Sequence, residues 1–173
     1  MATMFTDLLT IGGTHDISNV LTIWAKPLAN GSVATVDLDN GALVEDDGYT
    51  EDGVRKVKPY AGSASKKYFV QNVEEEQLLV DLGETDYKCF YNKAGELLRL
   101  YRVEAGLRVE VSAVTVKTSY NPKLGDTVFY NTTTKKYAIG ESASSTIVAV
   151  GKLVGIDTDF GYNADKTTYA IEF

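Results

Sequence analysis

The stretch LRVEVSAVTV, residues 107–116, carries the clearest structural pattern in the chain. Leu107, Val109 and Val111 alternate with charged or polar residues, as in a strand with one buried face and one face in water. The alternation slips near Ala113, which predicts a β-bulge at that point. We therefore expect a half-buried β-strand that is interrupted once.

The rest of the chain also favours strands, because it holds fifteen glycines and eleven tyrosines but few long apolar patterns of helical period. The triplet Asp39-Asn40-Gly41 predicts a turn that needs positive φ. The run IVAVGKLVGI is too long for one flat strand, so Gly151 and Gly155 are expected to bend it. The further expected strands are residues 33–38, 67–73, 96–103, 127–130, 137–140, 146–157 and 168–173.

Turn signals divide the chain into segments. Asn121-Pro122 and Gly125-Asp126 interrupt the strand pattern and predict the main boundary. We expect an extended N-terminal arm at 1–30, a β-rich domain at 31–118 and a small β-barrel-like module at 119–173. The predicted fold class is mainly β, with small β-barrel or sandwich modules and at most one short helix.

One helix is a candidate, at residues 72–84, NVEEEQLLVDLGE. Asn72 could cap it, the glutamates suit the positive end of the helix dipole and Gly83 would end it. The alternative is an acidic turn followed by a strand at 77–82, and the pattern leaves both open. Residues 45–53, EDDGYTEDG, predict an exposed acidic loop.

Net charge and composition exclude several classes of function. The net charge of −7 argues against binding to nucleic acid or to an anionic membrane surface. The start of the chain lacks the pattern of a secretory signal, and no apolar run reaches the length of a membrane span, so a soluble chain made in the cytoplasm is expected. Cys89 is the only cysteine, which excludes a disulfide within the chain and zinc sites built from several thiolates.

No strong catalytic pattern is present in the sequence. His15 is the only histidine, so a Ser-His-Asp arrangement would have to use it, next to Asp16. Its context, GGTHD, is more typical of a turn, and no phosphate-binding glycine motif occurs. A hydrolase that uses carboxylates such as Asp37 and Asp39 is the last alternative. We therefore expect no enzyme activity and no cofactor.

One short segment resembles a calcium loop. Its oxygen-bearing side chains recur around a glycine, and calcium takes six to eight oxygen ligands. The twelfth position of the loop is Thr168 instead of a bidentate glutamate, and the flanks read as strands. A polar hairpin turn is the favoured interpretation. The candidate ligands are Asp157, Asp159, Asn163 and Asp165.

Four longer segments resemble capsid-associated proteins from tailed phages of Gram-positive hosts. They are LLTIGGTHDISNVLTI, ANGSVATVDL, YNKAGELLRLYRVEAGLRVEVSA and LGDTVFYNTTTKKYAIGESASSTIVAVGKLVGI. The firmest positions are Gly125-Asp126, Val128 and the Ala149-Val150-Gly151-Lys152 strand. The acidic stretch 45–53 has no counterpart in that pattern.

The resemblance implies a decoration or head-stabilising protein of the virion, assembled in the host cytoplasm. Its partner would be the major capsid protein or another virion protein, and a homo-oligomer is expected because such proteins hold neighbours through repeated symmetric contacts. The N-terminal arm would dock on a neighbour through apolar side chains, with Trp24 either in the core or in that contact. The expected contact residues are Ile17, Val20, Ile23 and Trp24.

Two alternatives stay open. A head–tail connector, tail or fibre-base component can share the same small β modules. A carbohydrate-binding β-sandwich, which belongs to another class, would use tyrosines and the Asp157 loop with calcium. Copy number per particle separates the first alternative from decoration, and glycan binding that a chelator abolishes would support the second.

Overall fold

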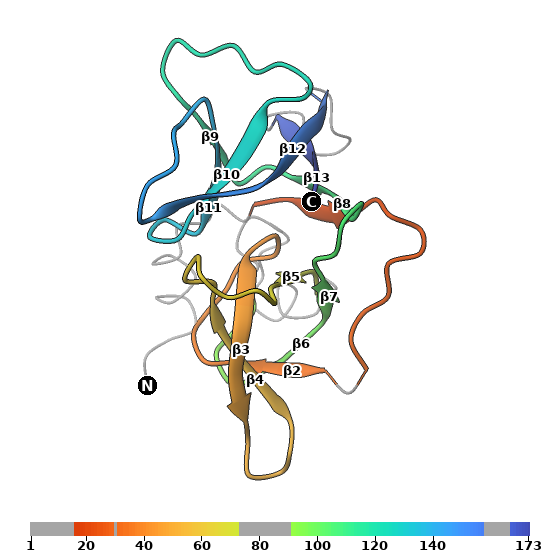
Figure 1. Cartoon of the computed structure of the whole chain (residues 1–173). Coiled ribbons are helices and arrows are strands. Elements are labelled where there is room, and N and C mark those ends of the chain that lie inside the picture. Colours follow the sequence, from red (N-terminus) through yellow and green to blue (C-terminus); the bar gives the residue numbers. More distant parts are fainter. Residues whose placement is uncertain (1–15, 30, 73–90, 158–166) are drawn as a thin grey trace, which may run out of the picture.

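A computed structural model describes residues 16–29, 31–72, 91–157 and 167–173 of the chain. These parts are all β, with thirteen strands and no helix (Figure 1), so the expectation of a mainly β fold is confirmed. No helix in the described ranges could cross a membrane. The strands are β1 (Ser18–Val20), β2 (Ser32–Ala34), β3 (Leu43–Tyr49), β4 (Arg55–Pro59), β5 (Tyr68–Val70), β6 (Leu97–Leu98), β7 (Leu100–Arg102), β8 (Arg108–Val111), β9 (Val114–Val116), β10 (Thr127–Asn131), β11 (Lys136–Ile139), β12 (Ile147–Asp157) and β13 (Thr168–Glu172).

Seven strands form the first sheet, in the order β1-β8-β13-β12-β10-β11-β9. All neighbours are antiparallel except β11 and β9, which run parallel. The stretch quoted first, residues 107–116, supplies β8 near one edge and β9 at the other edge. Because only two residues join these strands, the sheet has to curl so that its two edges approach each other, which produces a half-barrel.

At Ser112 and Ala113, where the alternation of apolar and polar residues is interrupted, the chain leaves β8 near one edge of the sheet and enters β9 at the other edge. The backbone N–H of Ser112 donates to the carbonyl of Ile17, just before β1, at 2.9 Å. The carbonyl of Ala113 accepts from the N–H of Tyr137, in β11, at 2.8 Å. The sequence predicted a bulge here, and the structure shows a break between two strands that pair with opposite edges.

Glycines bend the long strand β12 around the half-barrel, as the sequence predicted. The register shifts between Leu153 and Gly155 against β13, and it shifts again where Gly151 and Ala149 face β10. A Cβ at Gly151 would lie 2.4 Å from the carbonyl oxygen of Glu172. Since only glycine allows that approach of two backbones, this position fixes how tightly β12 and β13 curve.

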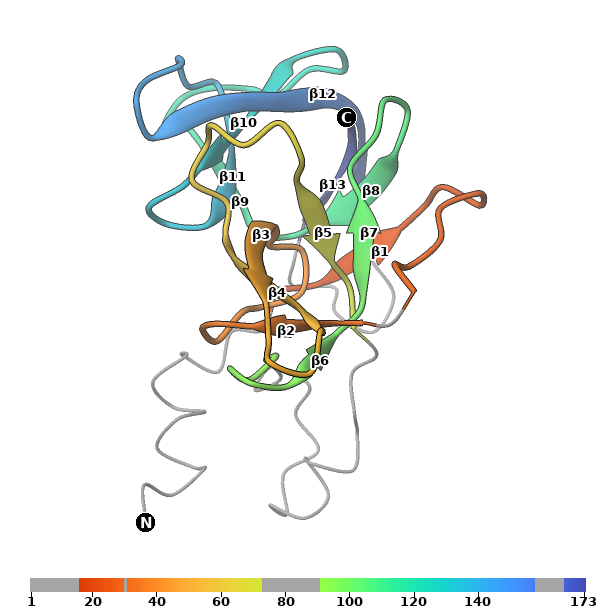
Figure 2. The ribbon, with the colours of Figure 1, turned by 60° about the horizontal axis from the view of Figure 1, so that its bottom comes forward.

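Six strands form the second sheet, in the order β6-β2-β4-β3-β5-β7. Its longest element is the β3–β4 hairpin, which extends away from the rest of the chain in Figure 1 and comes toward the viewer in Figure 2. The prediction of an exposed acidic loop at 45–53 was wrong about the loop for residues 45–49, which lie in β3, although most of the stretch is exposed. Asp46 pairs with Arg55 across the hairpin, and Asp47 lies 3.4 Å from the amino group of Lys58, so basic partners on β4 keep the acidic residues in a strand.

The two sheets share a core through two buried tyrosines. The rings of Tyr130 and Tyr137, from β10 and β11, meet edge to face at 5.2 Å. The N–H of Leu43 donates to the Tyr130 hydroxyl at 3.2 Å, and the Tyr137 hydroxyl donates to the carbonyl of Gly41 at 3.0 Å. Both hydroxyls of the first sheet therefore bond the backbone of the second, and burial raises the pKa of both tyrosines.

Strand pairing connects the three predicted segments. The predicted arm contributes β1, which pairs with β8 from Ser18↔Val111 to Val20↔Val109. The predicted middle domain contributes β8 and β9, and the predicted C-terminal module contributes the other four strands of the same sheet. The core cluster of this sheet also includes Leu43, Tyr60 and Phe69 from the second sheet. The boundary predicted at 118/119 thus falls within one sheet.

Candidate functional site

The segment between β1 and β2 is held at both ends. The N–H of Leu21 donates to the carbonyl of Arg108 at 3.0 Å, and the N–H of Arg108 donates to the Thr22 hydroxyl at 2.6 Å. At the other end, the N–H of Leu28 donates to the carbonyl of Leu100, in β7, at 2.8 Å. Between these contacts, the N–H of Ala25 donates to the carbonyl of Thr22 and closes a turn. We call residues 21–28 the crossing segment.

The four residues predicted to contact a partner divide into two pairs. Ile17 is 4% exposed and Val20 packs against the core, so both lie within the chain's own fold. Ile23 is fully exposed and Trp24 is 52% exposed, both at the turn of the crossing segment. Leu21, at the start of the segment, is 42% exposed. The structure thus places three exposed apolar side chains within four consecutive positions of the crossing segment.

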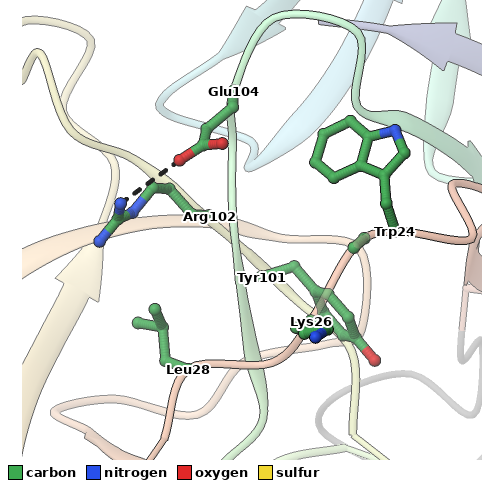
Figure 3. A pocket seen from close by; sticks show the side chains of 7 residues that line it. Trp24, Lys26, Leu28, Tyr101, Arg102 and Glu104 are labelled. Carbon is green, nitrogen blue, oxygen red and sulfur yellow. Dashed lines mark hydrogen bonds and ion pairs between the residues drawn. The ribbon is translucent and has the colours of Figure 1, made fainter.

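A groove of about 230 Å³ lies between the crossing segment and β7. One side is formed by Trp24, Lys26 and Leu28, and the other by residues of β7 and the chain that follows it (Figure 3). The guanidinium of Arg102 lies 3.3 Å from the carboxylate of Glu104, and both side chains are more than half exposed. The complete lining is Trp24, Ala25, Lys26, Leu28, Tyr101, Arg102 and Glu104.

This groove combines apolar surface with charged groups of both signs. Leu28 packs against the core of the second sheet, while Ala25 and Tyr101 pack against the core of the first. Packing against the core therefore fixes these three apolar side chains, whereas the charged side chains of Lys26, Arg102 and Glu104 are exposed to solvent. An arrangement of this kind binds and orients a small group, because a rigid apolar surface supplies contact area and the few polar groups select the orientation.

Sequence reasoning did not find the β7 half of this groove. It predicted a strand at 96–103 but gave no reason to place that strand beside Trp24, about 77 positions earlier in the chain. The isolated bridge between Pro27 and Tyr101 brings the two together. The one local signal is that Arg102 and Glu104 stand at alternate positions, which puts both side chains on the same face of an extended chain.

A second, smaller hollow of about 180 Å³ holds the carboxylates considered for hydrolysis. Asp37 accepts the N–H of Ala94 at 2.8 Å, and Asp39 accepts the backbone N–H groups of Asn40 and Asp16. Asp16 in turn lies 3.3 Å from the amino group of Lys136. These hydrogen bonds are those of turns and strand ends, so the contacts of the carboxylates are structural.

Several predicted site residues lie outside the described residues. They are His15, Cys89, Asp159, Asn163 and Asp165, together with all but the first residue of the candidate helix at 72–84. Asp157 is described, as the last and exposed residue of β12. Among the described residues, no three His, Cys, Asp or Glu side chains lie close enough together to hold a metal ion.

Comparison with known proteins identifies the family. A model of the family described as YonC prophage protein matches residues 12–173, almost the whole chain and all of its described strands. No curated protein and no solved structure gave a match. The chain therefore belongs to the YonC prophage protein family and is a protein of bacteriophage origin.

Proposed function

We propose that the chain is a non-enzymatic structural component of the phage particle, and that it decorates or cements the head by binding the major capsid protein. Phage origin supports a role in the phage life cycle, and the resemblance of the sequence to capsid-associated proteins supports the head as its location. The observation that carries the proposal is the pair of exposed residues Ile23 and Trp24 on a segment that is fixed at both ends.

The turn of the crossing segment is apolar and held in place, and both properties favour binding to another protein. Burying a side chain such as Ile23 stabilises a complex by roughly 1.5–3 kcal/mol. Because the ends of the crossing segment are already hydrogen-bonded to β7 and β8, binding need not order a loose loop, and less of that gain is lost to conformational entropy. On a symmetric shell, the same modest contact repeats at every site. The chain itself acts as a homo-oligomer in this proposal.

The test is a count of bound copies. Native mass analysis of the purified chain gives its oligomeric state, and the chain is then mixed with heads of its own phage that were assembled without it. We expect the chain to bind over the whole shell, with a number of bound copies proportional to the number of copies of the major capsid protein. Binding at a single vertex would instead assign the chain to the head–tail junction, and absence of binding would reject the head as partner.

Substitutions locate the contact better than deletion of the predicted arm. Removing residues 1–30 would also remove β1 and the buried Ile17, so loss of binding would be ambiguous. Ile23→Ser changes a fully exposed side chain, and we expect it to weaken head binding at least tenfold. Leu124→Ser is the matched control, since Leu124 is 68% exposed on the loop before β10 and should bind normally. Equal binding by the two variants would contradict the assigned contact.

A further inference from the structure

The groove beside Trp24 contains charged groups that the proposed head contact does not use. Ile23, the most exposed apolar residue of the crossing segment, does not line the groove, whereas Trp24 does. About half of the Trp24 side chain is open to solvent, so part of its ring is available to a ligand. An aromatic ring beside a few fixed polar groups is a common feature of small-ligand sites.

The charged side chains of the groove offer donors and acceptors side by side. Arg102 carries five N–H donors and Glu104 two acceptor oxygens, and within the part of the chain that the structure describes the 3.3 Å contact between them leaves further bonding capacity on both. Lys26 adds an exposed ammonium group on the opposite side of the groove. These side chains suit a ligand that donates and accepts hydrogen bonds at neighbouring atoms. Two adjacent hydroxyl groups on a ring are such a ligand.

The geometry points to a binding site for one sugar ring of a glycan, with the ring stacked against Trp24 and two adjacent hydroxyls bonded to Arg102 and Glu104. A volume of about 230 Å³ lies below the roughly 300–1,000 Å³ of sites for drug-sized ligands, so the groove holds one ring. A proline-rich peptide is the competing occupant, because such peptides dock in aromatic grooves. It needs an extended groove, and it makes no use of paired hydroxyl-binding groups.

Trp24 also provides the measurement. It is the only tryptophan of the chain, so fluorescence excited selectively at tryptophan reports on the groove alone. The intact chain is titrated, without heads, with trisaccharides of glucose, mannose, galactose and N-acetylglucosamine, and with a proline-rich peptide. We expect at least one saccharide to change the emission saturably, with a dissociation constant of the order of 1 mM, since one ring offers only about a dozen non-hydrogen atoms.

Variants separate specific binding from a general effect on fluorescence. Glu104→Gln keeps the size of the side chain and the tryptophan, and we expect it to weaken saccharide binding at least tenfold. Glu96→Gln is the matched control, because Glu96 is exposed in a turn away from the groove lining, and it should bind as the unmodified chain does. A response to no saccharide, a response that Glu104→Gln leaves intact, or a response to the peptide alone would each overturn the assignment. Since heads are absent, the result is independent of the proposed head binding.

Discussion

The two sheets of the molecule reach their stability in different ways. In the seven-stranded sheet, β10 to β13 have four to eleven residues each, and pairing joins β10 to β11 and β12 to β13, which are neighbours in the sequence. In the six-stranded sheet, β2, β5, β6 and β7 have two or three residues each and pair with distant parts of the chain, as Ser32 does with Leu98. The first sheet depends on local pattern, and the second on specific tertiary contacts.

A buried network of side-chain amides lies beside the second sheet. Asn40, which is 1% exposed, accepts the N–H of Asn72 at 3.0 Å and donates to its carbonyl at 3.0 Å. The amide of Asn92 donates to both Asn40 and the carbonyl of Leu38. Three distant parts of the chain therefore meet at one buried amide. Such a network stabilises a structure only while all of its members are present.

Substitution in the apolar core that the two sheets share should have the largest effect and tests whether the sheets unfold together. Leu153, in the first sheet, and Phe69, in the second, are both fully buried in the cluster that joins the sheets. We expect Leu153→Ala and Phe69→Ala each to lower the free energy of unfolding by about 3–5 kcal/mol. In denaturant each variant should keep one cooperative transition, shifted as a whole. If a variant instead showed two transitions, and its substitution shifted one of them and left the other unchanged, the sheets would unfold independently.

Loss of the amide network should have the next largest effect on the free energy of unfolding. Asn40→Ala leaves the N–H and carbonyl of Asn72 and the amide of Asn92 without their partner. We expect about 2–3 kcal/mol of destabilisation, measured by urea unfolding. Asn131→Ala is the control, because the Asn131 side chain accepts the N–H groups of the neighbouring turn residues Thr133 and Thr134, and it should cost about 1 kcal/mol or less. Equal effects would contradict a special role of the network.

Alkaline pH should weaken the junction of the two sheets through Tyr130 and Tyr137. Burial raises the pKa of both tyrosines in the folded chain, whereas in the unfolded chain they ionise near pH 10. Above about pH 10 the unfolded chain therefore holds fewer protons than the folded chain. The free energy of unfolding should be unaffected by these groups below that pH and should fall above it, by about 1.4 kcal/mol per pH unit for each tyrosine.

A conservative variant can show which tyrosine causes the fall in the free energy of unfolding at alkaline pH. Tyr137→Phe removes the hydroxyl that donates to Gly41 and should cost about 1 kcal/mol at pH 7. The same variant should lose one of the two alkaline contributions, so its stability should approach that of the unmodified chain as the pH rises from 10 to 11. Unfolding curves at several pH values measure both quantities. A parallel fall for the two proteins would exclude Tyr137 as the titrating group.

The smallest effect is expected at the tip of the β3–β4 hairpin. The guanidinium of Arg55 pairs with Asp46 and lies 5.7 Å from the ring centre of Tyr49 and 5.5 Å from that of Tyr68. The pair is partly exposed, so Asp46→Asn should cost less than about 1 kcal/mol and less still in high salt. A loss of 2 kcal/mol or more, measured by thermal unfolding, would mean that the hairpin depends on this ion pair as the sheet depends on Asn40.

Part of the candidate site was evident from the sequence and part was not. Trp24 and Ile23 stood out because they are large apolar residues close to a proline in a segment of uncertain burial. Ile17 and Val20 looked equivalent to them, but they lie in and beside β1, where pairing with β8 turns them toward the core. Exposure at these four positions depends on a partner strand about 90 residues away, which no local pattern reveals.

The sequence by itself determined the strands whose side chains alternate and whose ends carry turn residues. The 107–116 stretch, β10 to β13 and the bends at Gly151 and Gly155 belong to this group, because alternation and glycine act through neighbours in the chain. Only the tertiary structure decided that 107–116 is two strands toward opposite edges of one sheet, that residues 45–49 lie in a strand paired with β4, and that Trp24 faces β7. These features depend on contacts between distant residues, and such contacts form only when the whole chain has folded.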